Sequence, residues 1–238
     1  MAAWGVQSLQ AVWWGLKPPT VSAQDIYQTM IGSGPPAVQT NPALGLAAAI
    51  GTDGLSVFRI QVQQTRVDFF ENSQSQGGQT FPLFSDLKST MQRFRQRLAS
   101  ASGIVGDAAR LALVVNTSEE AASAEEATNL LVSKLGITLP FQDGSELIFQ
   151  INRKRPLASM PGQEINLIMK WLVENVQQIT ISSGAPIVQA TVLKTLSVDV
   201  NTVPSTRVFT PAEQPAIFQE IFDEAERLSQ VNALSALS

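Results

Sequence analysis

The sequence of 238 residues contains no cysteine and no histidine. Without cysteine the chain has no disulfide, no thiol nucleophile and no thiolate ligand for zinc, and it could persist in either an oxidising or a reducing compartment. Without histidine it lacks the general base of the usual catalytic triads and the commonest metal ligand. Carboxylates, Lys, Ser and Tyr are therefore the only reactive groups that remain.

Long apolar runs and an excess of basic residues are also missing. No apolar run approaches the roughly 20 residues of a membrane-spanning helix, and residues 1–16 contain no Lys or Arg, which does not fit a signal peptide. With 16 Lys and Arg against 20 Asp and Glu, the formal net charge is −4. We therefore expect a cytoplasmic protein without membrane contact, for which nucleic acid is not the expected partner.

The motifs that usually accompany catalysis are absent as well. Asp68, Asp143 and Glu146 could act as catalytic carboxylates, but they show no nuclease spacing, and the chain has no Gly-x-Ser-x-Gly elbow. The Gly-Ser-Gly-Pro-Pro stretch at 32–36 lacks the Lys-Ser/Thr of a phosphate loop. We expect no catalytic residue, no metal and no cofactor.

What the chain does contain is enough apolar material for a packed core, since 44% of its residues are hydrophobic. Its length allows one large or two small domains. No internal repeat or linker divides it, so we predict a single globular α+β domain over 21–238, with an antiparallel or mixed sheet and about four helices. A Trp-rich segment, 1–20, precedes this domain.

The most regular pattern lies between Leu55 and Phe70, where apolar and polar residues alternate with the period of a half-buried strand. A reversal at Gln63–Gln64, or a four-residue loop with the same pairing, makes this a hairpin with Arg59 opposite Asp68. Gly51 to Gly54 then forms a turn, and a third strand precedes it at Leu44–Ile50.

The N-terminal segment holds three of the four tryptophans, Trp4, Trp13 and Trp14. One interpretation is an edge strand whose rings cover the core, and the other is a segment that binds a partner or a second copy. The second interpretation predicts that deletion of Met1–Lys17 leaves the melting temperature nearly unchanged.

Four segments have helical periodicity and recognisable ends. The second of them carries cations on its other faces, and these could meet an acidic partner or only solvent. The expected helices run from a cap at Ser22 to Gly32, from a cap at Ser85 through Leu98, from Ser123 to Gly136, and onward from Pro215.

Further strands are expected at Arg110–Asn116 and Glu146–Asn152, and with the helix between them they resemble a βαβ unit. Gln163–Ile181 fits either a helix or strands, and its β-branched content favours two strands that meet near Glu174. Val188–Asn201 alternates as one long strand. Lys194 interrupts its apolar parity and indicates a bulge or a sheet edge.

The segments VLKTLSVDVNT and FTPAEQPAIFQEIFDEAERL, a long strand followed by a terminal amphipathic helix, resemble a sporadically distributed family of functionally uncharacterised bacterial proteins. The stretch LKSTMQRFRQRLASASGIVGDAARLALVVN is similar to the same family. The resemblance covers about the C-terminal two thirds of the chain. It implies an α+β fold and no particular substrate.

By elimination, we expect a binding or regulatory protein that acts through protein–protein contacts or self-association. The alternatives are a structural subunit of a larger assembly, phage-derived or secretory, and a hydrolase that uses neither His nor Cys. The side chains expected at the partner contact are Trp4, Trp13, Trp14, Arg59, Arg66, Arg93 and Arg97.

Overall fold

The structure, a computed structural model, describes residues 4–74, 81–141, 143–182 and 185–237. The strands are β1 (Gly5–Trp14), β2 (Ala37–Asn41), β3 (Leu46–Asp53), β4 (Ser56–Gln63), β5 (Arg66–Ser73), β6 (Arg110–Ala121), β7 (Ile148–Pro156), β8 (Glu164–Ser182) and β9 (Ala185–Thr202). The helices are α1 (Ala23–Ile31), α2 (Leu87–Leu98), α3 (Ser102–Val105), α4 (Ala124–Leu135) and α5 (Gln214–Val231), with short 3₁₀ turns η1 (Pro42–Leu44) and η2 (Leu234–Leu237).

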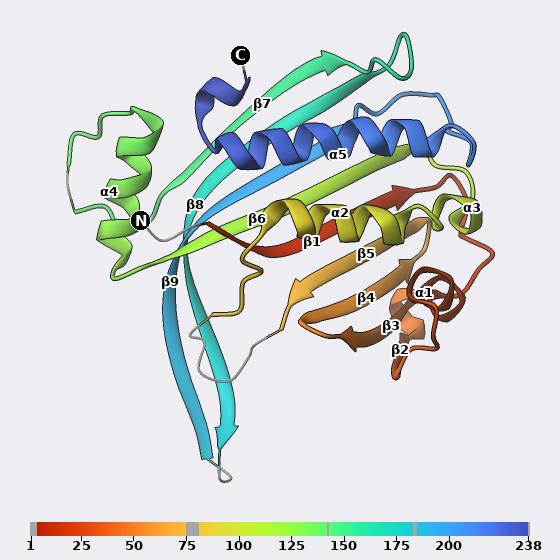
Figure 1. Ribbon diagram of the computed structural model, residues 1–238, viewed down its shortest axis with the longest axis horizontal. Coiled ribbons are helices and arrows are strands. Elements are labelled where there is room, and N and C mark those ends of the chain that lie inside the picture. Colours follow the sequence, from red (N-terminus) through yellow and green to blue (C-terminus); the bar gives the residue numbers. More distant parts are fainter. Residues whose placement is uncertain (1–3, 75–80, 142, 183–184, 238) are drawn as a thin grey trace.

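Within the described residues, nine strands form one open antiparallel sheet in the order β2-β3-β4-β5-β1-β6-β9-β8-β7 (Figure 1). The expected combination of an antiparallel sheet and helices is confirmed, and strands dominate it. The helices contact one face of the sheet: α1 packs on β3 and β4, α2 on β1, α4 on β8 and β9, and α5 on β6 and β9. The core lies between this face and the helices, because alternate side chains of each strand point there.

The order of the elements repeats, although the sequence shows no repeat. Apart from β2 and α3, which have no counterpart, β1, α1, the strands β3 to β5 and α2 correspond in order to β6, α4, the strands β7 to β9 and α5. The strands of the first half occupy one side of the sheet and those of the second half the other side. The first strand of each half is the innermost one, so β1 and β6 pair with each other at the boundary between the halves. Their last helices also meet, with the rings of Phe94 and Phe222 6.0 Å apart. The halves are therefore related by an approximate two-fold axis between β1 and β6.

The predicted hairpin is confirmed as β4 and β5, and β3 precedes it as the predicted third strand. The predicted reversal at Gln63–Gln64 is displaced by one residue, because the loop consists of Gln64 and Thr65. Gln64 has a φ of 48°, the left-handed conformation that a two-residue hairpin loop requires. Gln64 thus adopts a left-handed backbone conformation that the sequence pattern did not predict.

The register of this hairpin differs from the prediction by two residues. Ile60 lies opposite Phe69, not Val67, and the predicted pair of Arg59 with Asp68 is wrong, since Arg59 lies opposite Phe70. A shift by two preserves the face on which each side chain lies. The core residues are accordingly those that the alternation predicts, including Phe58, Ile60 and Phe69, each with no exposed surface.

The N-terminal segment does not form an edge strand. β1 lies between β5 and β6, and its backbone is hydrogen-bonded on both sides. Its central position follows from its composition, because GVQSLQAVWW places Leu9, Ala11 and Trp13 against the helices and Val12 against the other face. Met1 to Ala3 of the predicted segment lie outside the described residues.

The predicted helices are all present. Ser22 and Asp25 form the capping box of α1, and Gly32 and Gly136 end α1 and α4 in the left-handed conformation. The cap of α2 is Asp86, not Ser85, since the Asp86 side chain accepts from the Ser89 N–H at 3.1 Å. Among the described residues, no helix combines the length and the apolar character needed to cross a membrane.

Three strand predictions need correction. β6 and β7 do not form a βαβ unit, because β9 and β8 lie between them and every pairing is antiparallel. The ambiguous segment 163–181 is neither a helix nor two strands, because all of it after Gln163 lies in one continuous strand, β8. The edge strand β2, which follows the Gly-Ser-Gly-Pro-Pro stretch, was not among the predicted strands.

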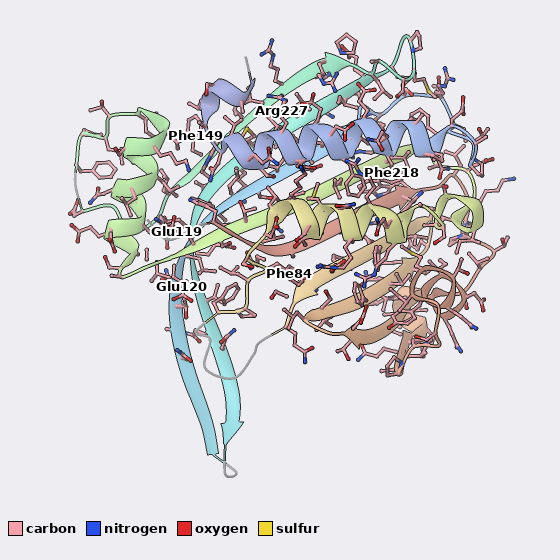
Figure 2. The ribbon with its side chains drawn as sticks, in the orientation of Figure 1. Phe84, Glu119, Glu120, Phe149, Phe218 and Arg227 are labelled. Atoms are coloured by element: carbon pink, nitrogen blue, oxygen red, sulfur yellow. The ribbon has the colours of Figure 1, made fainter. Side chains whose placement is uncertain are left out.

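Lys194 marks neither a bulge nor an edge. It pairs in register with Glu119 on β6 and with Val173 on β8. Its ammonium group lies 3.0 Å from the Glu119 carboxylate, and only 7% of Lys194 is exposed. Figure 2 shows Glu119 near α4, where β8 and β9 leave the body of the sheet. The ion pair is what permits a lysine on the covered face of a central strand.

Candidate functional site: the open face of the sheet

Among the described residues, no helix packs on the second face of the sheet, which we call the open face. The strand register orders its side chains in rows that cross the strands from β4. The first row is Gln63, Arg66, Trp14 and Arg110. The second is Gln61, Asp68, Val12, Ala112, Asn201 and Asn166. The third is Arg59, Phe70, Gln10, Val114, Asp199 and Ile168.

Trp14 lies at the centre of the first row, at the seam between the two halves. The guanidinium carbons of Arg66 and Arg110, one from each neighbouring strand, lie 4.7 and 4.8 Å from the centroid of its indole ring. Both distances fall within the range of cation–π contacts. Both arginines therefore contact the ring, and this places an aromatic residue and two cations in one group.

Polar side chains connect this group to the second row. Asp68 accepts from Nε and Nη2 of Arg66, both at 2.7 Å, and from Nε2 of Gln10 at 2.7 Å. On the other side, Arg110 donates to Oδ1 of Asn201 at 2.8 Å. Asp68 is 1% exposed and Asn201 not at all, although no helix covers them. The longer neighbouring side chains shield them, and their hydrogen bonds offset the cost of that burial.

Asp199 is the one carboxylate of the third row. Burial raises its pKa above the ordinary value, against the opposing effects of the Asn201 amide, which donates to it at 2.8 Å, and of the nearby positive charge of Arg110. The desolvation of the charged form outweighs the two stabilising contacts.

The positive charges of the open face are less well compensated. Arg59, Arg110 and Lys170 form no ion pair within the part of the chain that the structure describes. Arg66 has a partner in Asp68, but 38% of its side chain remains exposed. The open face thus carries several cations without a carboxylate partner among the described residues, although the register places Glu120, Glu164 and Glu174 on it as well.

The same face has a hollow of about 230 Å³ between β6, β9 and β8. Lys170 and Glu174 bring opposite charges to its lining, and Thr195 donates from its hydroxyl to Glu174. A hollow of this size could hold one side chain of a bound protein.

Arg93 and Arg97, predicted to contact a partner, lie on the covered face. They reach from α2 to Glu71 of β5, with Nη2 of Arg93 2.8 Å from Oε1 and Nη1 of Arg97 3.2 Å from Oε2. Glu71 has no exposed surface and also accepts from the hydroxyl of Ser56 at 2.8 Å. In this fold the two arginines compensate a buried carboxylate.

The three N-terminal tryptophans are separated by the fold. Trp13 is 1% exposed; its ring centroid is 4.8 Å from that of Phe218, which lies on α5 (Figure 2), and its Nε1 donates to Gln214 at 3.1 Å. Trp4 lies near α4, with the Lys134 ammonium 4.7 Å from its ring centroid. Of the three, only Trp14 belongs to the open face.

Of the predicted set, the structure brings Trp14 and Arg66 together and places Arg59 elsewhere on the open face, and it adds Arg110 and Gln10, which the sequence analysis missed. Arg110 precedes the buried Leu111 in β6, so the alternation predicts that its side chain lies on the opposite face from Leu111. The sequence could not predict that Arg110 lies beside Trp14, because this depends on the pairing of strands about 100 residues apart.

The candidate catalytic carboxylates do not form a site. Asp143 and Glu146 are exposed in the connection between α4 and β7, whereas Asp68 is buried on β5. Within the described ranges, no group of three or more carboxylates could hold a metal ion.

Comparison of the chain with family models, curated proteins and solved structures gives no match. The geometry and charge of the open face are therefore the basis on which we assign a function.

Proposed function

We propose that this chain is a binding protein whose open face docks an acidic surface of another protein. The observation that carries the proposal is the group formed by Trp14, Arg66 and Arg110 in the middle of a sheet face without helices. Trp and Arg are the residues most enriched among those that dominate protein–protein binding energies. Because they are held by each other and by Asp68, little side-chain entropy is lost on binding.

The cations of the open face that lack a carboxylate partner indicate the chemistry of the bound protein. Arg59, Arg110 and Lys170 lack carboxylate partners among the described residues, so a protein that presents Asp or Glu would compensate them. Nucleic acid is the alternative ligand for these cations, because they could also contact phosphates, and nuclease treatment in the test distinguishes the two. Arg66 and Arg110 already contact the Trp14 ring, so a base that stacked on this ring would have to compete with them.

The test is a quantitative affinity purification with two matched double variants. Arg59→Glu with Lys170→Glu reverses two charges of the open face that make no hydrogen bond or ion pair with described residues. Lys88→Glu with Arg153→Glu makes the same change in net charge at exposed positions of α2 and β7. Lysates of the source cell are treated with nuclease, and the captured proteins are then purified and titrated against each variant by calorimetry.

We expect the open-face variant to bind the purified partner at least about tenfold more weakly than the control variant does. The wild-type affinity should fall with added salt, because exposed charges are screened. Equal loss of binding in both double variants would refute the open face as the docking surface. Capture that disappears after nuclease treatment would show a nucleic-acid ligand instead.

A further inference from the structure

One hairpin differs greatly in length between the two halves of the repeat. β4 and β5 have 8 residues each, whereas their counterparts β8 and β9 have 19 and 18. In the first half, a hairpin with strands of 8 residues is sufficient to form the sheet. The additional length of β8 and β9 therefore serves something other than the packing of the sheet.

The extra length forms a two-stranded ribbon that leaves the body of the protein (Figure 1). We define the ribbon as Val176–Ser182 of β8 and Ala185–Thr191 of β9, which pair with each other throughout. The pairing of β6 with β9 ends at Val192, and that of β7 with β8 ends at Leu172. At a rise of about 3.3 Å per residue, the ribbon extends about 20 Å, and neither of its outer edges pairs with another described strand.

The composition of this ribbon leaves its edges unprotected. Residues 175–193 contain no Asp, Glu, Lys or Arg, although natural edge strands usually carry charges or proline that prevent pairing with another chain. Pro186 has no N–H and so weakens the β9 edge as a pairing surface. The β8 edge, Val176–Ser182, has no such interruption.

We propose that the β8 edge of the ribbon pairs antiparallel with the same edge of a second copy of this chain and forms a symmetric dimer. In such a pairing each residue lies near its own equivalent, so a charged edge would oppose like charges, whereas an uncharged one does not. A lone two-stranded ribbon is marginally stable in water, and the dimer would convert it into four strands. This contact is separate from the open face and is independent of the function proposed for it.

The oligomeric state in solution tests the proposal, measured by sedimentation equilibrium over a concentration series. The first variant replaces Val176–Thr191 with Asn-Gly, because Asn175 and Val192 are direct partners that a two-residue turn can join. The second keeps the full chain and carries Gln177→Lys with Gln178→Lys. Its matched control carries Gln39→Lys with Thr40→Lys on β2, the exposed strand at the other edge of the sheet.

We expect the wild type and the β2 control to dimerise, the shortened chain to be monomeric with a cooperative melt, and the ribbon variant to dimerise at least tenfold more weakly. A wild type that stays monomeric at its highest soluble concentration overturns the proposal. A shortened chain that still dimerises overturns it too, as does a β2 control that loses dimerisation while the ribbon variant keeps it. If the shortened chain fails to fold, the two full-length variants decide.

Discussion

The guanidinium of Arg93 on α2 donates to the fully buried carboxylate of Glu71 on β5, with 2.8 Å between Nη2 and Oε1. Arg97, one helical turn later, donates to the other oxygen and also reaches Asp53 at 2.7 Å. These contacts tie α2 to both β5 and the end of β3. From the sequence alone, the same arginines were expected at a partner contact.

Replacing Glu71 should therefore destabilise the protein strongly. Glu71→Gln removes the charge between two guanidinium groups, and we expect the free energy of unfolding to fall by about 3 kcal/mol, as when one partner of a buried ion pair is removed. Urea denaturation measures the loss. Asp223→Asn is the control: Asp223 is 58% exposed and pairs with Arg95 at 2.7 Å, so its loss should cost roughly 0–1 kcal/mol. Equal effects of the two substitutions would contradict the buried network.

A methyl group should not be tolerated at Gly51. The hydroxyl of Tyr27 lies where the Cβ of an alanine would be placed, and Cδ of Pro36 would be 2.8 Å away. Gly51→Ala should cost about 1–3 kcal/mol through displacement of α1, measured by thermal or urea unfolding. Gly34→Ala, where no atom lies within 4 Å, should change stability by less than about 0.5 kcal/mol. A harmless Gly51→Ala would mean that α1 does not pack on β3 as described.

Deletion of Met1–Lys17 should abolish cooperative unfolding. The deletion removes β1, which pairs with β5 and β6 at the centre of the sheet, and with it Trp13 from the core. The interpretation from the sequence in which these tryptophans bind a partner predicts instead that the deletion leaves the melting temperature nearly unchanged. Circular dichroism melts distinguish the two outcomes, and a truncated chain that melts like the full one would show that β1 is dispensable.

The pH dependence of Asp199→Asn should reveal the raised pKa of Asp199. A carboxyl whose pKa is higher in the folded than in the unfolded state destabilises the fold when it is charged, that is, above its folded-state pKa. At neutral pH Asp199→Asn should therefore be at least as stable as the wild type. As the pH falls through the folded-state pKa toward the unfolded-state value, the wild type should recover relative stability. Urea denaturation at a series of pH values measures this difference, and a constant difference would contradict the raised pKa.

Local signals in the sequence were sufficient for the elements themselves. The Ser22 capping box begins α1, and Gly32 and Gly136 end α1 and α4 as predicted, because caps depend on residues within one turn. The alternation from Phe58 to Phe69 identified the buried face of the hairpin, since a period of two assigns faces without knowledge of the partner strand.

Only the tertiary structure decided which strands are neighbours and how they are aligned. The hairpin register depended on Gln64 in a left-handed conformation, which glutamine seldom adopts and no composition rule indicates. The central position of β1, the pairing of Lys194 with Glu119 and the meeting of Trp14 with Arg110 all depend on contacts between distant segments. Alternation within a strand assigns a side chain to a face, but its neighbours on that face come from other strands. For that reason the residues of the open face were partly recognisable one by one, while the group they form was not.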